Sequence, residues 1–159
     1  MTARAFGVDL LPHRPPMRLV EEIADLVAGV SARGLRVARP EDWYFQGHFP
    51  DDPVVPATVL IELLAQTGGL AAASGGARSG SAAMLRVAAV GPFKFPGGAR
   101  PHQRLDARAR VVGRMGGMIK IEGEVLADGV RVAVGSVTLA DVRVDQAAKT
   151  AADGIRRSG

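Results

Sequence analysis

A histidine and a glutamate, His48 and Glu62, are the two residues of this chain best placed to exchange protons with a substrate. His48 lies in the segment 46–56, which holds three prolines and is expected to be a rigid loop. Glu62 follows 14 residues later, in the apolar segment that this loop leads into. A histidine gains and loses a proton near neutral pH, and a carboxyl group in apolar surroundings can also carry one there. The pair therefore predicts a general base and a general acid.

The segment that carries Glu62 is apolar on nearly every side. Its two strongly polar residues are Glu62 and Gln66, whose spacing of four places them on one stripe of a helix. One interpretation is structural, with Glu62 at a solvent-exposed edge or accepting backbone hydrogen bonds. The nearby, proline-braced His48 favours the chemical interpretation.

The other two histidines and the composition indicate no metal or cofactor. His13 and His102 lie in proline-containing loops, where a lone histidine is usually solvated or structural, so neither is assigned a role. The chain has no cysteine, which excludes a disulfide framework, a thiolate nucleophile and a cysteine-based zinc site. We therefore expect neither a metal nor a cofactor.

Length and charge restrict the class of protein. The 159 residues, 47% of them hydrophobic, are enough for one domain with a real core. The net charge of +4 is dispersed, with no run of five like charges and no helix-turn-helix pattern, so we expect no nucleic-acid partner. The longest apolar stretch, 59–73, is interrupted by polar residues and glycines, and the N-terminus lacks a secretory pattern. We expect a cytoplasmic protein that does not cross a membrane.

The elements that must position the pair are one helix and a set of strands. A helix is predicted over 56–74, with proline at its start and Gly75 at its end. Because it has no polar face, it must be covered by a sheet and by a second copy of the chain. A connection is predicted over 71–83, and a tight turn at Asp128–Gly129 and another turn over 113–117. Strands are predicted over 23–30, 34–38, 84–95, 105–112, 118–127 and 130–142.

This order of elements predicts an α+β protein in which an antiparallel sheet of about five or six strands curls around one apolar helix. That is the hot-dog fold, although other α+β layouts share the same elements. The domain is expected to span 1–143, with 144–159 as a flexible C-terminal tail.

Two stretches carry a specific resemblance. The sequence QGHFPDDPVVP at 46–56, followed by LIELLAQ at 60–66, closely resembles the signature of the FabZ-type (3R)-hydroxyacyl-acyl carrier protein dehydratases of type II fatty acid synthesis. The presence of Glu62 rather than aspartate is similar to this type and not to the related dehydratase-isomerase. The resemblance covers most of the chain to about residue 143 and continues in LPHRP at 11–15, LVE at 19–21 and FKF at 93–95.

The resemblance implies a reaction and a role for each matching residue. A 3-hydroxyacyl thioester would lose water to give a trans-2-enoyl thioester, in a fatty acid or related lipid or polyketide pathway. His48 would take the C2 proton, Glu62 would assist departure of the C3 hydroxyl, and the Ala57 N–H would bind the thioester carbonyl. The family usually has glycine where this chain has Ala57, whose methyl group crowds that approach. A second departure is Pro101-His102-Gln103 in place of a Pro-Gly-Asp turn.

Further residues and partners follow from the same resemblance. The partner would be an acyl carrier protein with its phosphopantetheine-linked acyl chain, and the active unit a homodimer or a trimer of dimers, because the family draws its histidine and acid from different protomers. For Phe49 and Phe95, a position in the ordinary core is an equal alternative to lining the acyl tunnel. The expected substrate-binding residues are Gly47, Phe49, Ala57, Gln66 and Phe95, and the expected carrier-docking residues are Lys94, Arg100 and Arg104.

Two alternative functions stay open on the sequence. A hot-dog acyl thioesterase would also use a carboxylate on the helix, but it has no need for the His-Phe-Pro loop. A non-catalytic module that binds acyl thioesters is favoured by Ala57 and by the altered turn at 101–103.

Overall fold

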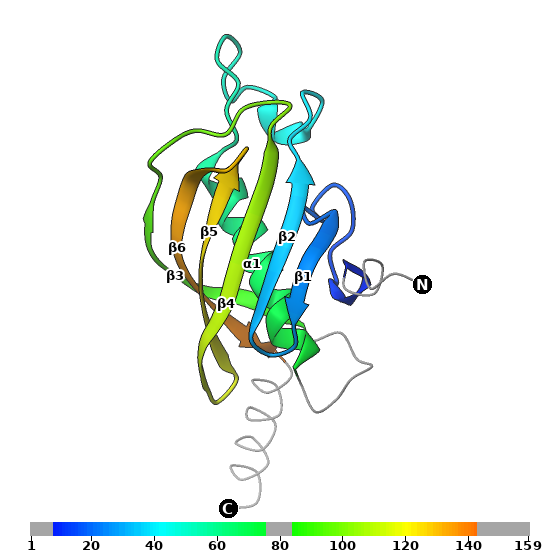
Figure 1. The fold of residues 1–159 in the computed structure, drawn as a ribbon, viewed down its shortest axis with the longest axis vertical. Helices are drawn as coiled ribbons and strands as arrows, with labels where there is room; N and C mark the ends of the chain where they lie inside the picture. The colour runs from blue at the N-terminus through cyan, green and yellow to red at the C-terminus, as the bar shows by residue number, and fades with distance from the viewer. Residues whose placement is uncertain (1–7, 76–83, 143–159) are drawn as a thin grey trace, which may run out of the picture.

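The computed structural model describes residues 8–75 and 84–142, in which one antiparallel sheet curls around one long helix (Figure 1). The six strands lie in the order β1-β2-β4-β5-β6-β3, and α1 contacts all of them except β3 closely. The predicted hot-dog arrangement is confirmed. The elements are η1 (Val8–Leu10), β1 (Glu22–Val27), β2 (Ser31–Val37), η2 (Trp43–Phe45), α1 (Ala57–Ser74), β3 (Leu85–Lys94), β4 (Arg104–Met115), β5 (Met118–Ala127) and β6 (Val130–Asp141).

The helix α1 forms the centre of the core. It begins after Pro56, which has φ of −56° and lacks the N–H that a first turn could not use. By length and composition its 18 residues could cross a membrane, with a mean hydropathy of 1.3, but 61% of them are buried inside the fold, as in a core helix. The middle of the helix is buried as predicted, whereas its first two residues are exposed and Glu62, Gly69 and Ala73 are half-buried along one stripe. That stripe is where the helix remains accessible.

Glycines allow α1 to approach the sheet closely. A Cβ atom at Gly68 would lie 2.5 Å from Ile121 Cγ2 of β5, and one at Gly123 would lie 2.7 Å from Leu64 Cδ1 of α1. Neither position can hold a larger side chain unless the helix or the strand moves. The two glycines therefore set the depth at which the helix lies against the strands.

Most predicted boundaries are confirmed, and the differences have local causes. Asp128 and Gly129 adopt φ of 47° and 84° in the predicted turn between β5 and β6. The prediction that a strand ends at Val112 is wrong. The pairing register with β5 shifts between Val111 and Gly113, so the strand accommodates the glycine and β4 continues to Met115. The connection predicted from residue 71 begins only after the helix ends at Ser74, and its remainder and the predicted tail lie outside the described residues.

The strand β3 is an edge of the sheet and is exposed for most of its length. It pairs with β6 on one side only. Val87 and Val90 on this strand are 42% and 53% exposed. An edge strand with apolar, exposed side chains is a surface on which another strand can pair.

Candidate active site

The loop that carries His48 follows η2 and is anchored by buried aromatic rings. Tyr44 and Phe45 are buried, and Gly47 has φ of +85°, a conformation that favours glycine. The backbone N–H of His48 donates to the Phe45 carbonyl at 3.2 Å. The loop therefore turns sharply just before the histidine and presents it from a fixed backbone.

The ring of His48 is oriented by one backbone contact. Its Nδ1 lies 2.9 Å from the Val54 carbonyl oxygen, which can only accept a hydrogen bond, so Nδ1 carries the hydrogen. The neutral ring then has its lone pair on Nε2, the form that a general base requires. Phe49 stacks on the same ring with 4.2 Å between centroids and is 53% exposed.

A buried network behind this loop holds it to the sheet. Arg36 of β2, only 7% exposed, pairs with Asp42 at 2.5 Å and donates from Nε to the Tyr44 hydroxyl at 3.2 Å. That hydroxyl donates to Asp42 Oδ2 at 2.7 Å. Burial acts to raise the pKa of Asp42, but hydrogen bonds from Tyr44, from the Arg39 N–H and from Arg36 outweigh it and hold that pKa below its usual value of 3.8. Burial raises the pKa of Tyr44, which stays protonated.

We expect the Arg36→Met substitution to lower the free energy of unfolding at pH 7 by about 3 kcal/mol, because it leaves the Asp42 carboxylate without its buried partner. The folded chain binds a proton on Asp42 less readily than the unfolded chain. The contribution of Asp42 is therefore complete above pH 3.8 and is lost as the pH falls through its lower, folded-state pKa. Urea unfolding at pH 7 and at about pH 3 measures both effects.

The matched control is Arg39→Ala, since Arg39 is 44% exposed and its side chain pairs with Glu21 at the surface. We expect this control substitution to lower the free energy of unfolding by less than about 1 kcal/mol. Equal decreases in the free energy of unfolding for the two variants would show that the network does not hold the loop as described. The same would follow if Arg36→Met lowered the free energy of unfolding as much at low pH as at neutral pH.

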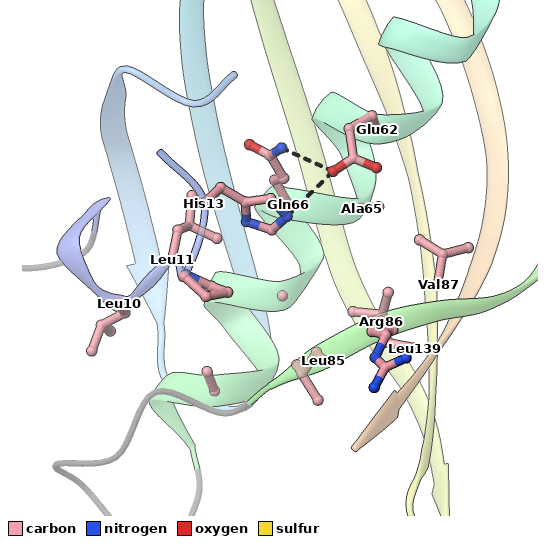
Figure 2. A pocket seen from close by; sticks show the side chains of 13 residues that line it. Leu10, Leu11, His13, Glu62, Ala65, Gln66, Leu85, Arg86, Val87 and Leu139 are labelled. Atoms are coloured by element: carbon pink, nitrogen blue, oxygen red, sulfur yellow. Dashed lines mark hydrogen bonds and ion pairs between the residues drawn. The ribbon is translucent and has the colours of Figure 1, made fainter. Parts of the chain in front are cut away.

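Glu62 lies on the accessible stripe of α1 and lines a pocket of about 250 Å³ (Figure 2). Its Oε1 accepts a hydrogen bond from Gln66 Nε2 at 2.9 Å and lies 3.4 Å from His13 Nε2. The walls of the pocket come from α1, from the end of η1 and the segment after it, from the start of β3 and from β6, and they include Leu11, Ala65, Leu85, Val87 and Leu139. The carboxylate thus lies in a mainly apolar hollow beside the exposed edge of the sheet.

The structure gives His13 a place that the sequence analysis missed. Its place in a proline-containing loop predicts no role for it, but Figure 2 shows its ring directed at Glu62. The signal that could have identified it was its position inside the LPHRP stretch of the resemblance. His102, by contrast, is exposed in a turn with φ of 70°.

The remaining expected substrate-binding residues lie apart from the Glu62 pocket, except Gln66. Ala57 is the first residue of α1 and is exposed, so its N–H belongs to the helix end that has no intrahelical acceptor. Phe95 follows the end of β3, stacks on Phe93 with 5.8 Å between centroids and is 42% exposed. Gln66 lines the pocket but is only 2% exposed, and its amide bonds to protein groups.

The three expected docking residues are exposed on the surface. Lys94 ends β3 and Arg104 begins β4. Arg100 pairs with Asp52, which lies in the His48 loop. This pair links the surface near residue 100 to the loop that carries the histidine.

Within one chain, the histidine and the glutamate are not brought together. The Glu62 pocket is lined by His13 and not by His48, whose ring bonds to Val54. Among residues 8–75 and 84–142, no three His, Asp or Glu side chains gather as the ligands of a metal ion would. Within one chain, His48 and the Glu62 pocket therefore lie apart.

Comparisons with known proteins bear on this arrangement. Residues 11–136 match the model of a family described as a FabA-like domain. A protein of Sorangium cellulosum called 3-hydroxyacyl-[acyl-carrier-protein] dehydratase FabZ is 32% identical over 131 residues, covering 82% of this chain and 84% of that protein. A protein of the same name from Campylobacter lari is 34% identical over 126 residues, covering 78% and 86%. The dehydratase heterocomplex ApeI:P from Xenorhabdus doucetiae shares the fold, with a TM-score of 0.72 at 19% identity over 87% of this chain and 92% of that chain.

Proposed function

Because this chain belongs to the FabA-like family, as a FabZ-type 3-hydroxyacyl-[acyl-carrier-protein] dehydratase, we propose that His48 and Glu62 carry its reaction. The enzyme is a hydro-lyase that removes water reversibly from a (3R)-hydroxyacyl thioester on acyl carrier protein and leaves the trans-2-enoyl thioester. The observation that carries the assignment is the His48 ring, whose Nδ1 is engaged by Val54 so that Nε2 is free to accept a proton.

The proposed steps balance in protons and electrons. Nε2 of His48 takes the proton from C2, the electron pair of that C–H bond forms the C2–C3 double bond, and the C3–O bond breaks. Glu62 donates a proton to the departing hydroxyl, which leaves as water. The protonated His48 and the ionised Glu62 then return to their starting forms by exchange with solvent.

Besides a base and an acid, the reaction needs a hydrogen-bond donor for the thioester oxygen as negative charge develops on it. The start of α1 supplies this donor. The N–H of Ala57 lies at the positive end of the helix dipole, where the first-turn N–H groups have no intrahelical acceptor. The methyl group of Ala57 stands beside this donor and narrows the approach, which restricts the acyl groups that fit.

We propose that two copies of the chain pair along β3 and complete each other's site. Three observations support this: β3 is an edge strand, its Val87 and Val90 are exposed, and its residues Leu85 and Val87 also line the Glu62 pocket. A strand of the partner beside β3 would cover the apolar side chains and bring partner residues to the pocket. The partner's His48 would then face Glu62.

An acyl carrier protein is the proposed macromolecular partner. Lys94 and Arg104 are exposed and positively charged, while Arg100 is already paired with Asp52. We propose that Lys94 and Arg104 contribute most to docking of an acidic carrier, since neither side chain forms an ion pair within residues 8–75 and 84–142.

Purified protein is expected to hydrate a short trans-2-enoyl thioester, such as a crotonyl thioester, with no added metal or nucleotide. The measurement is the loss of absorbance of the conjugated enoyl group. A saturated acyl thioester serves as the control, because release of free thiol from it would indicate the thioesterase alternative. Binding of the enoyl thioester without any loss of absorbance would indicate the acyl-binding alternative and contradict the proposal.

A further inference from the structure

The two oxygens of the Glu62 carboxylate have different surroundings. Both polar contacts that the structure gives this carboxylate, from Gln66 Nε2 and His13 Nε2, are made to Oε1. Figure 2 shows the other oxygen turned away from both of these side chains. The structure thus divides the carboxylate into an oxygen held by protein groups and an oxygen without such contacts in the described part of the chain.

The orientation of the Gln66 amide is determined by the backbone. Its Oε1 accepts the N–H of Leu19 at 2.8 Å, and its Nε2 donates to the Met17 carbonyl at 2.7 Å. A flipped amide would place an NH₂ group against the Leu19 N–H and an oxygen against the Met17 carbonyl, leaving the buried Leu19 N–H and the Met17 carbonyl without these hydrogen bonds. The second hydrogen on Nε2 must therefore point to Glu62 Oε1, which can only accept it.

The ring of His13, like the Gln66 amide, directs a nitrogen toward Glu62 Oε1. Its Nδ1 is buried and has no hydrogen-bond partner among the described residues, whereas its Nε2 lies 3.4 Å from Glu62 Oε1. A hydrogen on Nδ1 would be buried without an acceptor, while a hydrogen on Nε2 has a carboxylate oxygen 3.4 Å from that nitrogen. The neutral ring with its hydrogen on Nε2 is the favoured form.

We infer that His13 and Gln66 are positioning residues that bind Oε1 of Glu62 and so place the proton of the catalytic acid on Oε2. This inference rests on the proposed function. An oxygen that accepts a hydrogen bond from Gln66 and lies 3.4 Å from His13 Nε2 is a poorer site for a proton than Oε2, so Oε2 delivers its proton to the departing hydroxyl. The segment 13–19 therefore does more than cover the helix, since it sets the rotation of the carboxylate.

The kinetic test compares His13→Ala with His13→Gln in hydration of a crotonyl thioester that carries no carrier protein. Glutamine retains an N–H donor near the place of His13 Nε2, and alanine does not. We expect His13→Ala to lower kcat by about tenfold to a hundredfold, as for the loss of a hydrogen bond to a charged group, with KM almost unchanged. His13→Gln is expected to recover most of the loss.

The matched control is His102→Asn, which removes a histidine from an exposed turn and retains a residue that tolerates positive φ. It is expected to leave kcat unchanged. Equal kcat values for His13→Ala and His13→Gln, or a loss confined to KM, would overturn the inference.

A second measurement does not depend on turnover. Nitrogen NMR of the ring nitrogens of the three histidines is expected to show that the neutral form of His13 has its hydrogen on Nε2. Glu62→Gln is expected to shift the His13 signals and leave those of His102 in place. Unshifted His13 signals would overturn the contact even in an active enzyme. If the wild-type protein is inactive on every thioester but the His13 signals still shift in Glu62→Gln, the proposed function is refuted. The contact between His13 and Glu62 is then retained.

Discussion

Replacing His48 by alanine is expected to lower kcat for hydration by about 10²-fold to 10⁴-fold, the range for loss of a general base. In the proposed site, Nε2 of His48 takes the C2 proton during dehydration and returns it to C2 during hydration, and alanine offers no substitute in either direction. KM should change little, because the thioester carbonyl and the acyl chain are bound by other groups. Glu62→Gln is expected to produce a loss in the same range, since an amide can neither donate the proton in dehydration nor accept one from water in hydration.

Steady-state kinetics on enoyl hydration, together with thermal unfolding, measures these losses. Gln46→Ala is the matched control for the first substitution, because Gln46 is an exposed residue of the same loop. The control should retain wild-type kcat, and all three variants should unfold near the wild-type temperature. A His48→Ala protein that is folded and keeps more than about a tenth of wild-type kcat would show that another group is the base.

Mixing His48→Ala protein with Glu62→Gln protein is expected to restore activity from two inactive parents. In a two-fold dimer each site takes His48 from one chain and Glu62 from the other. A heterodimer of the two variants therefore has one intact site and one doubly altered site. Random exchange makes about half of the dimers heterodimers, so the mixture should recover about one quarter of wild-type activity.

This second prediction depends on proven exchange of subunits, which native mass spectrometry of differently tagged chains can establish. A mixture that exchanges fully and stays inactive would mean that each site lies within one chain. A stable monomer in light scattering would contradict the shared site from the start. A double variant, His48→Ala with Glu62→Gln, mixed with wild-type protein is the control, because its heterodimers have no intact site.

Periodicity and turn chemistry were enough to predict most of the fold. The missing polar face of residues 56–74 predicted a buried helix, and the Asp128–Gly129 pair predicted the turn that the structure contains. The end of β4 was missed because Gly113 was interpreted as a turn residue. A glycine has the same local freedom in a turn and in an irregularly paired strand, and only the partner strand decides between them.

The candidate site was less accessible to sequence reasoning. His48 and Glu62 could be selected from their types and neighbours, but the contact of His13 with Glu62 joins residues 49 positions apart in the sequence. Gln66 was expected to touch substrate, and nothing in the helix pattern shows that its amide is used by Leu19 and Met17. Such contacts depend on where the segment 13–19 lies against α1, which neither propensity nor spacing specifies.

The measurement that tests the dehydration most directly is an intact-mass time course of acyl carrier protein loaded with a (3R)-hydroxyacyl group. Wild-type enzyme is predicted to convert the carrier, up to equilibrium, to a form lighter by one water with its acyl chain still attached, while His48→Ala enzyme leaves its mass unchanged over the same period. Release of the carrier as a free thiol, or a mass that stays unchanged with wild-type enzyme, would contradict the assignment.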